Sequence, residues 1–190
     1  VYYIAVSGWT TGNGGRGDGF ANTGGGGAST QGTQLNIVSN LSGSSQSLTG
    51  TLALGDTGGS FAFNRNIAYE VKQGATTIAS GTITASASST ALNISVPAAN
   101  TGAAQLILDG SSFLKQVVAI NLTGSNQAIG TATMQNGDVD GSGEVDAVDI
   151  DEVIADFGST TDIVTDVDVS GEVDAVDIDI VIANFGGLDD

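Results

Sequence analysis

Apolar and polar residues alternate with a period of two through the middle of the chain. Leu92, Ile94 and Val96 share one parity, and residues 118–122 repeat the pattern. Alternation of this kind between glycine-containing turns predicts β-strands with one buried face. The same pattern marks two further segments, Leu48–Leu54 and Phe61–Lys72, and only Arg65 breaks the apolar parity of the second. Leu106–Leu108 suits a fully apolar strand.

These segments predict a mainly β fold, an antiparallel β-sandwich over residues 33–135. Short strands separated by turns, with no helical period among them, pack as two sheets. The run Ala68–Thr76, together with Asn93–Pro97 and Gly110–Lys115, resembles the transthyretin-like and carboxypeptidase-regulatory-like sandwiches of large extracellular bacterial proteins. That resemblance implies an Ig-like or transthyretin-like sandwich.

The first 32 residues have a different composition. Val1–Val6 is apolar and suits a strand, and the glycine-rich span that follows, to Gly32, suits a flexible tether. A tethered strand can add to the sheet of a neighbouring copy, and head-to-tail repetition would then build a fibre. The same strand can instead pair with its own sandwich or be the stub of a larger protein.

Residues 136–190 contain an internal repeat. The segment Asp138–Asp151 recurs as Asp166–Asp179, which indicates one structural unit used twice. Calcium takes about six to eight oxygen ligands, and a twelve-residue loop supplies them from positions 1, 3, 5, 7, 9 and 12, with glycine at position 6. The candidate calcium ligands are therefore Asp138, Asp140, Ser142, Glu144, Asp146 and Asp149 around Gly143, and Asp166, Asp168, Ser170, Glu172, Asp174 and Asp177 around Gly171.

A short amphipathic helix is predicted after each loop. Ile150, Val153, Ile154 and Phe157 form one apolar stripe at helical spacing. The segment between the two copies, 159–165, is too short for the entering helix of an ordinary EF-hand, so each unit is a loop plus its exiting helix. In the second copy the apolar stripe is Ile178, Val181, Ile182 and Phe185, and glycines 158 and 186 suit the C-caps of the two helices. Within the loops, valines 145 and 173 suit the inward position that pairs one loop with the other. Glu144 and Glu172 would bind calcium through their backbone carbonyls.

The duplicated loop and helix resembles a type I dockerin over nearly all of residues 136–190. The resemblance implies two bound calcium ions, a small three-helix module with near two-fold symmetry, and often a cohesin-like partner protein. Position 5 is serine where an acid or amide is usual, and position 12 is Asp149 or Asp177 where signalling EF-hands have glutamate, although dockerins commonly have aspartate there. The pairs Ala147-Val148 and Ala175-Val176 stand where cohesin-binding dockerins often carry hydroxyls, and the basic residues that usually follow are missing as well.

The net charge of −17 belongs to this C-terminal region, which holds 17 of the 21 acidic residues and no lysine or arginine. A segment of like charges should be disordered unless a cation neutralises it, so we expect chelation to unfold it. Clustered Lys and Arg, which phosphate contacts require, are absent, so no nucleic-acid partner is expected. No apolar run is long enough to predict a membrane span.

Cysteine and histidine are both absent, which excludes disulfides, thiolate nucleophiles and Ser-His-Asp catalysis. The chain is therefore expected not to be an enzyme. Calcium is plentiful outside cells and scarce inside them, and the N-terminus carries no signal sequence, so we expect a secreted, mature protein at the cell surface or beyond. Sequons at Asn40, Asn93 and Asn121 make it a candidate glycoprotein.

Two functions follow from these features. The leading hypothesis is a calcium-stabilised structural subunit of a surface fibre or matrix, whose copies associate through Val1–Val6. The alternative is a non-catalytic binding module that docks through its dockerin-like tail to a cohesin-type scaffold, with a carbohydrate- or protein-binding sandwich.

Overall fold

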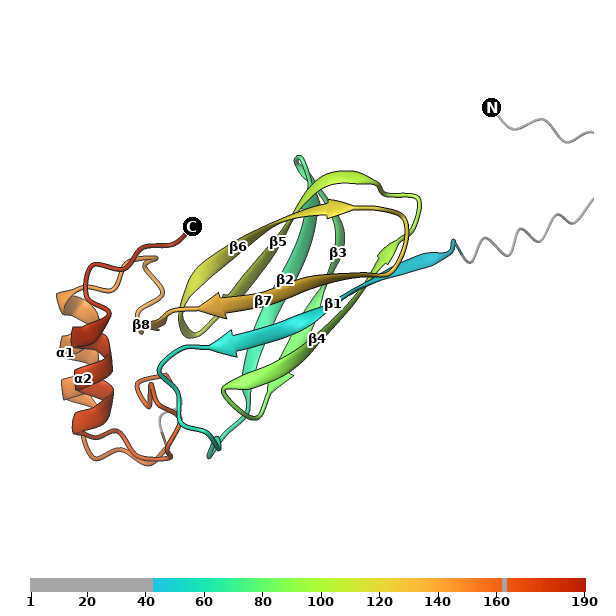
Figure 1. The fold of residues 1–190 in the computed structure, drawn as a ribbon. Helices are drawn as coiled ribbons and strands as arrows, with labels where there is room; N and C mark the ends of the chain where they lie inside the picture. The colour runs from blue at the N-terminus through green and yellow to red at the C-terminus, as the bar shows by residue number, and fades with distance from the viewer. Residues whose placement is uncertain (1–42, 162–163) are drawn as a thin grey trace, which may run out of the picture. The chain divides into compact units, whose positions relative to one another are not determined.

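The computed structural model describes residues 43–161 and 164–190, and there eight strands are followed by two helices (Figure 1). The predicted strand Val1–Val6, its tether and the Asn40 sequon lie outside the described residues. The elements are β1 (Ser45–Leu54), β2 (Arg65–Gln73), β3 (Thr76–Ala85), β4 (Ser89–Pro97), β5 (Gly102–Gly110), β6 (Ser112–Leu122), β7 (Gln127–Met134), β8 (Asn136–Asp138), α1 (Ala147–Ala155) and α2 (Ala175–Ala183).

The strands form two sheets, one with the order β4-β1-β7 and the other β3-β2-β5-β6-β8. This confirms the predicted mainly β sandwich. Every pair is antiparallel except β1 with β7, which run parallel. The expectation of a wholly antiparallel arrangement is wrong at this pair, because the connection after β6 crosses to the other sheet and brings β7 in alongside β1.

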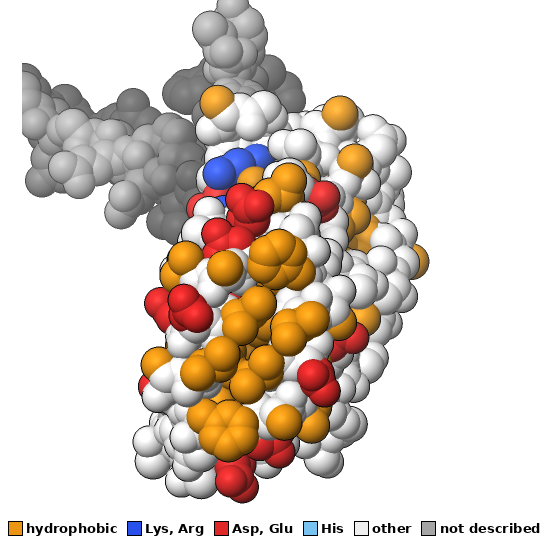
Figure 2. All heavy atoms as spheres, turned by 90° about the vertical axis from the view of Figure 1, so that its left-hand side faces the viewer, with side chains coloured by type: hydrophobic (Ala, Val, Ile, Leu, Met, Phe, Trp, Pro, Cys, Tyr) orange, Lys and Arg blue, Asp and Glu red, His pale blue; other side chains and the backbone are white. Residues whose placement is uncertain are grey.

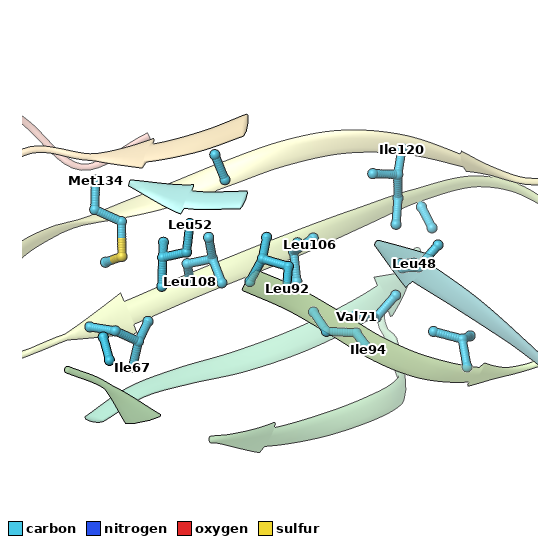
Figure 3. Close-up of a cluster of buried hydrophobic side chains, with 14 of the residues drawn as sticks. Leu48, Leu52, Ile67, Val71, Leu92, Ile94, Leu106, Leu108, Ile120 and Met134 are labelled. Atoms are coloured by element: carbon cyan, nitrogen blue, oxygen red, sulfur yellow. The ribbon is translucent and has the colours of Figure 1, made fainter. Parts of the chain in front are cut away.

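Alternate side chains from both sheets meet in one core (Figure 3). Leu48 and Leu52 from β1 are fully buried, as are Leu106 and Leu108 from β5, and Ile94 of β4 is 1 % exposed. Each such side chain contributes about 1.5–3 kcal/mol by leaving water. The parity in the sequence therefore identifies the core face of these strands correctly.

Arg65, which breaks the apolar alternation in the sequence, lies on the buried face of β2. Arg65 is the first residue of β2 and is 2 % exposed, in phase with the buried Ile67 and Val71. Phe61 and Phe63 precede β2, so the strand begins later than the alternation predicts. The reason for burying a guanidinium here lies in the C-terminal region, described below.

A second, smaller core lies between the two helices, which lie side by side (Figure 1). Most of its buried members are valines from the loops and helices, and Leu114 of β6 joins them. In each helix only one stripe residue is fully buried, Val153 or Val181, whereas Ile154 and Phe157 are 52 % and 58 % exposed. The predicted apolar stripe is therefore only partly buried, because these nine-residue helices pack mainly on each other and on the loops.

The described residues contain two α-helices, not the three that the dockerin resemblance implies. Both end as expected, with Gly158 and Gly186 at φ 82° and 83° just beyond their last turns. Neither helix in this described part is long and apolar enough to cross a membrane.

The parallel pairing of β1 and β7 predicts a strict requirement for glycine at position 50. A Cβ at Gly50 would collide with the carbonyl oxygen of Gly130 and lie 3.0 Å from Ile129 Cγ1. We expect Gly50→Ala to lower the free energy of unfolding by about 1–3 kcal/mol in urea titrations. Gly59→Ala is the control, since nothing lies within 4 Å of its Cβ position. Equal stabilities of the two variants would contradict this account of the pairing.

Candidate metal centre

Each acidic loop ends in a capping box that fixes the start of the following helix. The Asp146 side chain accepts a hydrogen bond from Val148 N at 2.7 Å, and the Asp149 side chain accepts one from Asp146 N at 2.7 Å. The second loop repeats both bonds through Asp174 and Asp177. Reciprocal capping of this kind satisfies amide groups that a helix N-terminus leaves free. The acidic residues at positions 9 and 12 of each loop therefore cap the helix that follows.

Three carboxylates from each loop converge. Oxygen atoms of Asp138, Asp140 and Asp149 all lie within 4.8 Å of one another, and those of Asp166, Asp168 and Asp177 do the same. Asp149 and Asp177 are fully buried, and Asp166 is 1 % exposed. Like charges this close, and this far from water, repel one another strongly.

Backbone amides of the loops orient these carboxylates. In the first loop Gly143 N donates to Asp138 Oδ2 at 3.1 Å, and Val139 N donates to Asp149 Oδ1 at 2.6 Å. In the second loop Gly171 N donates to Asp166 Oδ2 at 2.8 Å. The positive φ of both glycines, 87° and 104°, turns the chain back so that these bonds can form.

The other predicted ligands are not part of the two clusters. Ser142 Oγ donates to the carbonyl of Glu144 at 3.2 Å, and Ser170 Oγ donates to that of Glu172 at 3.3 Å. Both glutamates are exposed. Asp146 and Asp174 serve as helix N-caps. Of the twelve predicted residues, the structure gathers three carboxylates per loop.

The donor set suits a hard cation. Every group is an oxygen, the type that calcium prefers over nitrogen or sulfur. Asp138 is 4 % exposed, and its Oδ1 has no hydrogen-bond partner among the described residues. A buried carboxylate oxygen without a donor is costly, and a cation would satisfy it. The residues present therefore fit calcium.

The two loops are joined crosswise through their valines. Gly158 N, beyond α1, donates to the Val173 carbonyl at 2.8 Å, and Gly186 N, beyond α2, donates to the Val145 carbonyl at 2.8 Å. Both valines are fully buried in the smaller core. Each loop is thus fastened to the end of the other loop's helix, so the two units form one structure.

The sandwich holds the second loop by four successive carbonyls. The Asp166 carbonyl accepts a hydrogen bond from Arg65 Nη2, and the Val167 carbonyl accepts one from Asn136 Nδ2 at 2.7 Å. The carbonyls of residues 168 and 169 accept from Gly58 N and Ala62 N, both at 2.9 Å. Nothing in the sequence pattern linked Arg65 or Asn136 to the loop, because both contacts are made by residues distant in the chain.

Strain in the second loop reflects this attachment. Val169 has a φ of 63° and is fully buried, whereas the corresponding residue of the first loop is Gly141 with a φ of 71°. A β-branched residue in the left-handed region costs about 1–2 kcal/mol. Burial of Val169 and its bond from Ala62 N offset that cost.

The first loop is held by the C-terminal residues. Asp189 N donates to the Gly143 carbonyl at 2.9 Å, and Asp189 Oδ1 accepts from Lys115 N at 2.6 Å. The Asp190 carboxylate accepts from Val117 N at 3.1 Å. The chain end therefore ties the first loop to β6.

The outer surface of the two helices is apolar. Hydrophobic side chains gather on it, with acidic side chains around them (Figure 2). The exposures match between the two copies: Phe157 and Phe185 are 58 % and 57 % exposed, and Ile154 and Ile182 are 52 % and 53 %. We call this surface the helical face; its exposed members are Val148, Ile154, Phe157, Val176, Ile182, Phe185 and Leu188.

No protein-family model and no curated protein matches the sequence. In fold, the chain is similar to one chain in the crystal structure of an N-terminal interface mutant of a type II cohesin–X-dockerin complex from Acetivibrio cellulolyticus. The TM-score is 0.59 at 17 % identity, and the match covers 75 % of this chain and 97 % of that one. A C-terminal interface mutant from the same organism gives 0.55 with the same identity and coverage. The likeness shows a shared β-sandwich fold.

The buried acids predict an unusual pH dependence for the metal-free protein. Burial raises the pKa values of Asp138, Asp166 and Asp177 above the ordinary 3.8. The folded chain then binds protons more readily than the unfolded chain, so the free energy of unfolding should increase as pH falls from 7 through these raised values. Thermal melting in chelator between pH 7 and pH 5 measures it.

In the same experiment Asp138→Asn, which removes one of the raised carboxyls, should show a smaller gain on acidification. Stability that falls steadily with pH in the metal-free wild type would contradict the account.

Proposed function

We propose that this protein is a non-catalytic docking module in which two calcium ions fold the C-terminal loops and so present the helical face to a cohesin-type β-sandwich partner. The observation that carries the proposal is the duplicated cluster of three aspartates directly before each helix of that face. The cations would hold the loops, and the loops set the positions of the helices.

Calcium would be held mainly by the clustered carboxylates. Asp138, Asp140 and Asp149 would hold one ion, and the equivalent aspartates of the second loop the other. Ser142 and Ser170 leave position 5 uncharged, so each site carries less charge than a loop with an acid there. Modest affinity suits a compartment rich in calcium, and we therefore place the protein outside the cell.

The helical face defines the chemistry of the partner. An exposed apolar surface shared by two adjacent helices is typical of a protein interaction site. Residues 136–190 have no lysine or arginine, so a partner with an apolar centre and a basic rim would complement them. The two fold neighbours come from cohesin–X-dockerin complexes, which supports a cohesin-type partner.

The duplicated acidic loop with its following helix supports a dockerin-like interpretation of the C-terminal region. The fibre hypothesis depends on Val1–Val6, outside the described residues, so we prefer the docking function. A carbohydrate or protein ligand for the sandwich stays a prediction.

Calcium titration tests the metal part of the proposal. Isothermal calorimetry on the chelated wild-type chain should give two bound ions. Asp149→Asn and Asp177→Asn should each lose one ion, because each removes the fully buried carboxylate of one cluster. Calcium should also raise the melting temperature by mass action. A wild-type protein that binds no calcium, or variants that keep both ions, would contradict the assignment.

Substitutions on the helical face test docking. The probe is the cohesin of the type II complex from Acetivibrio cellulolyticus, with the calcium-loaded wild type as reference. Phe157→Asp and Phe185→Asp should each weaken binding by about 30-fold or more, the loss expected at an interface hot spot.

The matched control is Ser86→Asp, which adds the same charge at an exposed turn of the sandwich. It should bind like the wild type. Failure of the wild type to bind the cohesin, or equal losses in all three variants, would overturn the docking proposal.

A further inference from the structure

Ser112 is a buried polar residue of the sandwich whose hydroxyl has no hydrogen-bond partner among the described residues around it. It is the first residue of β6, directly after the tight turn from β5, and it has a φ of 64°. It is 1 % exposed. A buried, unpaired hydroxyl costs about 1–3 kcal/mol. The backbone strain adds to that cost, so a compensating interaction is expected.

The residue opposite Ser112 is the first candidate ligand of the first loop. Ser112 pairs with Asp138 in the β6–β8 ladder, and side chains of directly opposed residues project from the same side of a sheet. The Oδ1 atom of Asp138 is also buried and without a partner in the described part of the chain. Two buried oxygens thus stand unpaired on neighbouring strands.

Both residues line one cavity of about 310 Å³, and Asp140 lines it too. The Asp138 carboxylate belongs to the first cluster, so this cavity borders the position where three carboxylates converge. A cation with its bound water would supply partners for both the Ser112 hydroxyl and Asp138 Oδ1, for which the described residues supply none.

The second loop has no equivalent of this arrangement. Both carboxylate oxygens of Asp166 accept backbone hydrogen bonds, from Ser170 N at 3.0 Å and Gly171 N at 2.8 Å. The sandwich residue that contacts Asp166 is Arg65, which binds its carbonyl. Since the six candidate ligand types are the same in both loops, a difference between the sites must come from other residues, and Ser112 of the sandwich lies beside the first loop.

We propose that Ser112 is part of the first calcium site, with its hydroxyl in the oxygen environment of the ion. This inference rests on the proposed calcium function. Ser142, the loop's own hydroxyl, donates to the Glu144 carbonyl, and Ser112 provides a second neutral oxygen from outside the loop. The first site is thereby shared between the acidic loop and the sandwich.

The test uses full-length Ser112→Ala and Ser112→Gly. Glycine accepts a φ of 64° without strain, so the second variant keeps the fold even if alanine disturbs it. Calorimetric titration should show one of the two calcium sites weakened by about tenfold or more in both variants, the usual effect of removing an outer partner of a metal site. Ser86→Ala, at an exposed turn of the sandwich that does not line this cavity, is the control.

Thermal melting separates a role in calcium binding from a purely structural one. In chelator both variants should be at least as stable as the wild type, because they lose an unpaired buried hydroxyl. In calcium their gain in melting temperature should be smaller.

Equal destabilisation in chelator and in calcium, or unchanged titrations, would overturn the role of Ser112 and leave the calcium function intact. Absence of calcium binding by the wild type would overturn both.

Discussion

Repulsion between carboxylates is the constraint on which the C-terminal region, residues 136–190, depends. Each loop brings three aspartates within 4.8 Å, with two of the three buried, and residues 136–190 contain no cation of their own. Backbone amides and capping boxes orient the carboxylates but do not neutralise them. A divalent ion in each cluster would reverse the sign of the interaction. If calcium binds as proposed, the loop geometry, the valine core and the helical face would all be stabilised by that reversal.

The sandwich holds both acidic loops in place by hydrogen bonds. The second loop offers four consecutive carbonyls to sandwich donors, and the buried Arg65 makes one of those bonds. The first loop continues from β8 and is tied to β6 by the chain end. Because each loop is bonded to the sandwich and to the other helix, loss of order in one unit removes partners from the rest. Cooperative unfolding of the described residues follows from these shared bonds.

Local patterns in the sequence predict the elements that depend on neighbouring residues: strands with alternating apolar residues, and the repeated loops and helices. Alternation locates β1, β4 and β6, a short apolar run locates β5, and the repeat locates both loops, both helices and their glycine ends. The alternation does not predict strands β3 and β7, because these edge strands are rich in Thr, Ser, Ala and Gly and have few large apolar residues on one face. The sequence does not predict the roles of Arg65 and Ser112 either, for a different reason. Their roles come from strand register and from contacts between distant segments, so a polar residue in an apolar position looks like an interruption until its partner is known.

The exposed helical face follows from the small size of the core beneath it. A nine-residue helix is too short to be stable alone in water, so each helix depends on packing and on its cap. The valines fill only the space between the helices and the loops, which leaves Phe157 and Phe185 without cover. A face of this kind exists only while the capping aspartates and the clusters beside them stay folded. In the proposed function, metal occupancy and exposure of the apolar face would therefore be linked through the same few carboxylates, and a partner that binds the face would in turn stabilise the loaded loops.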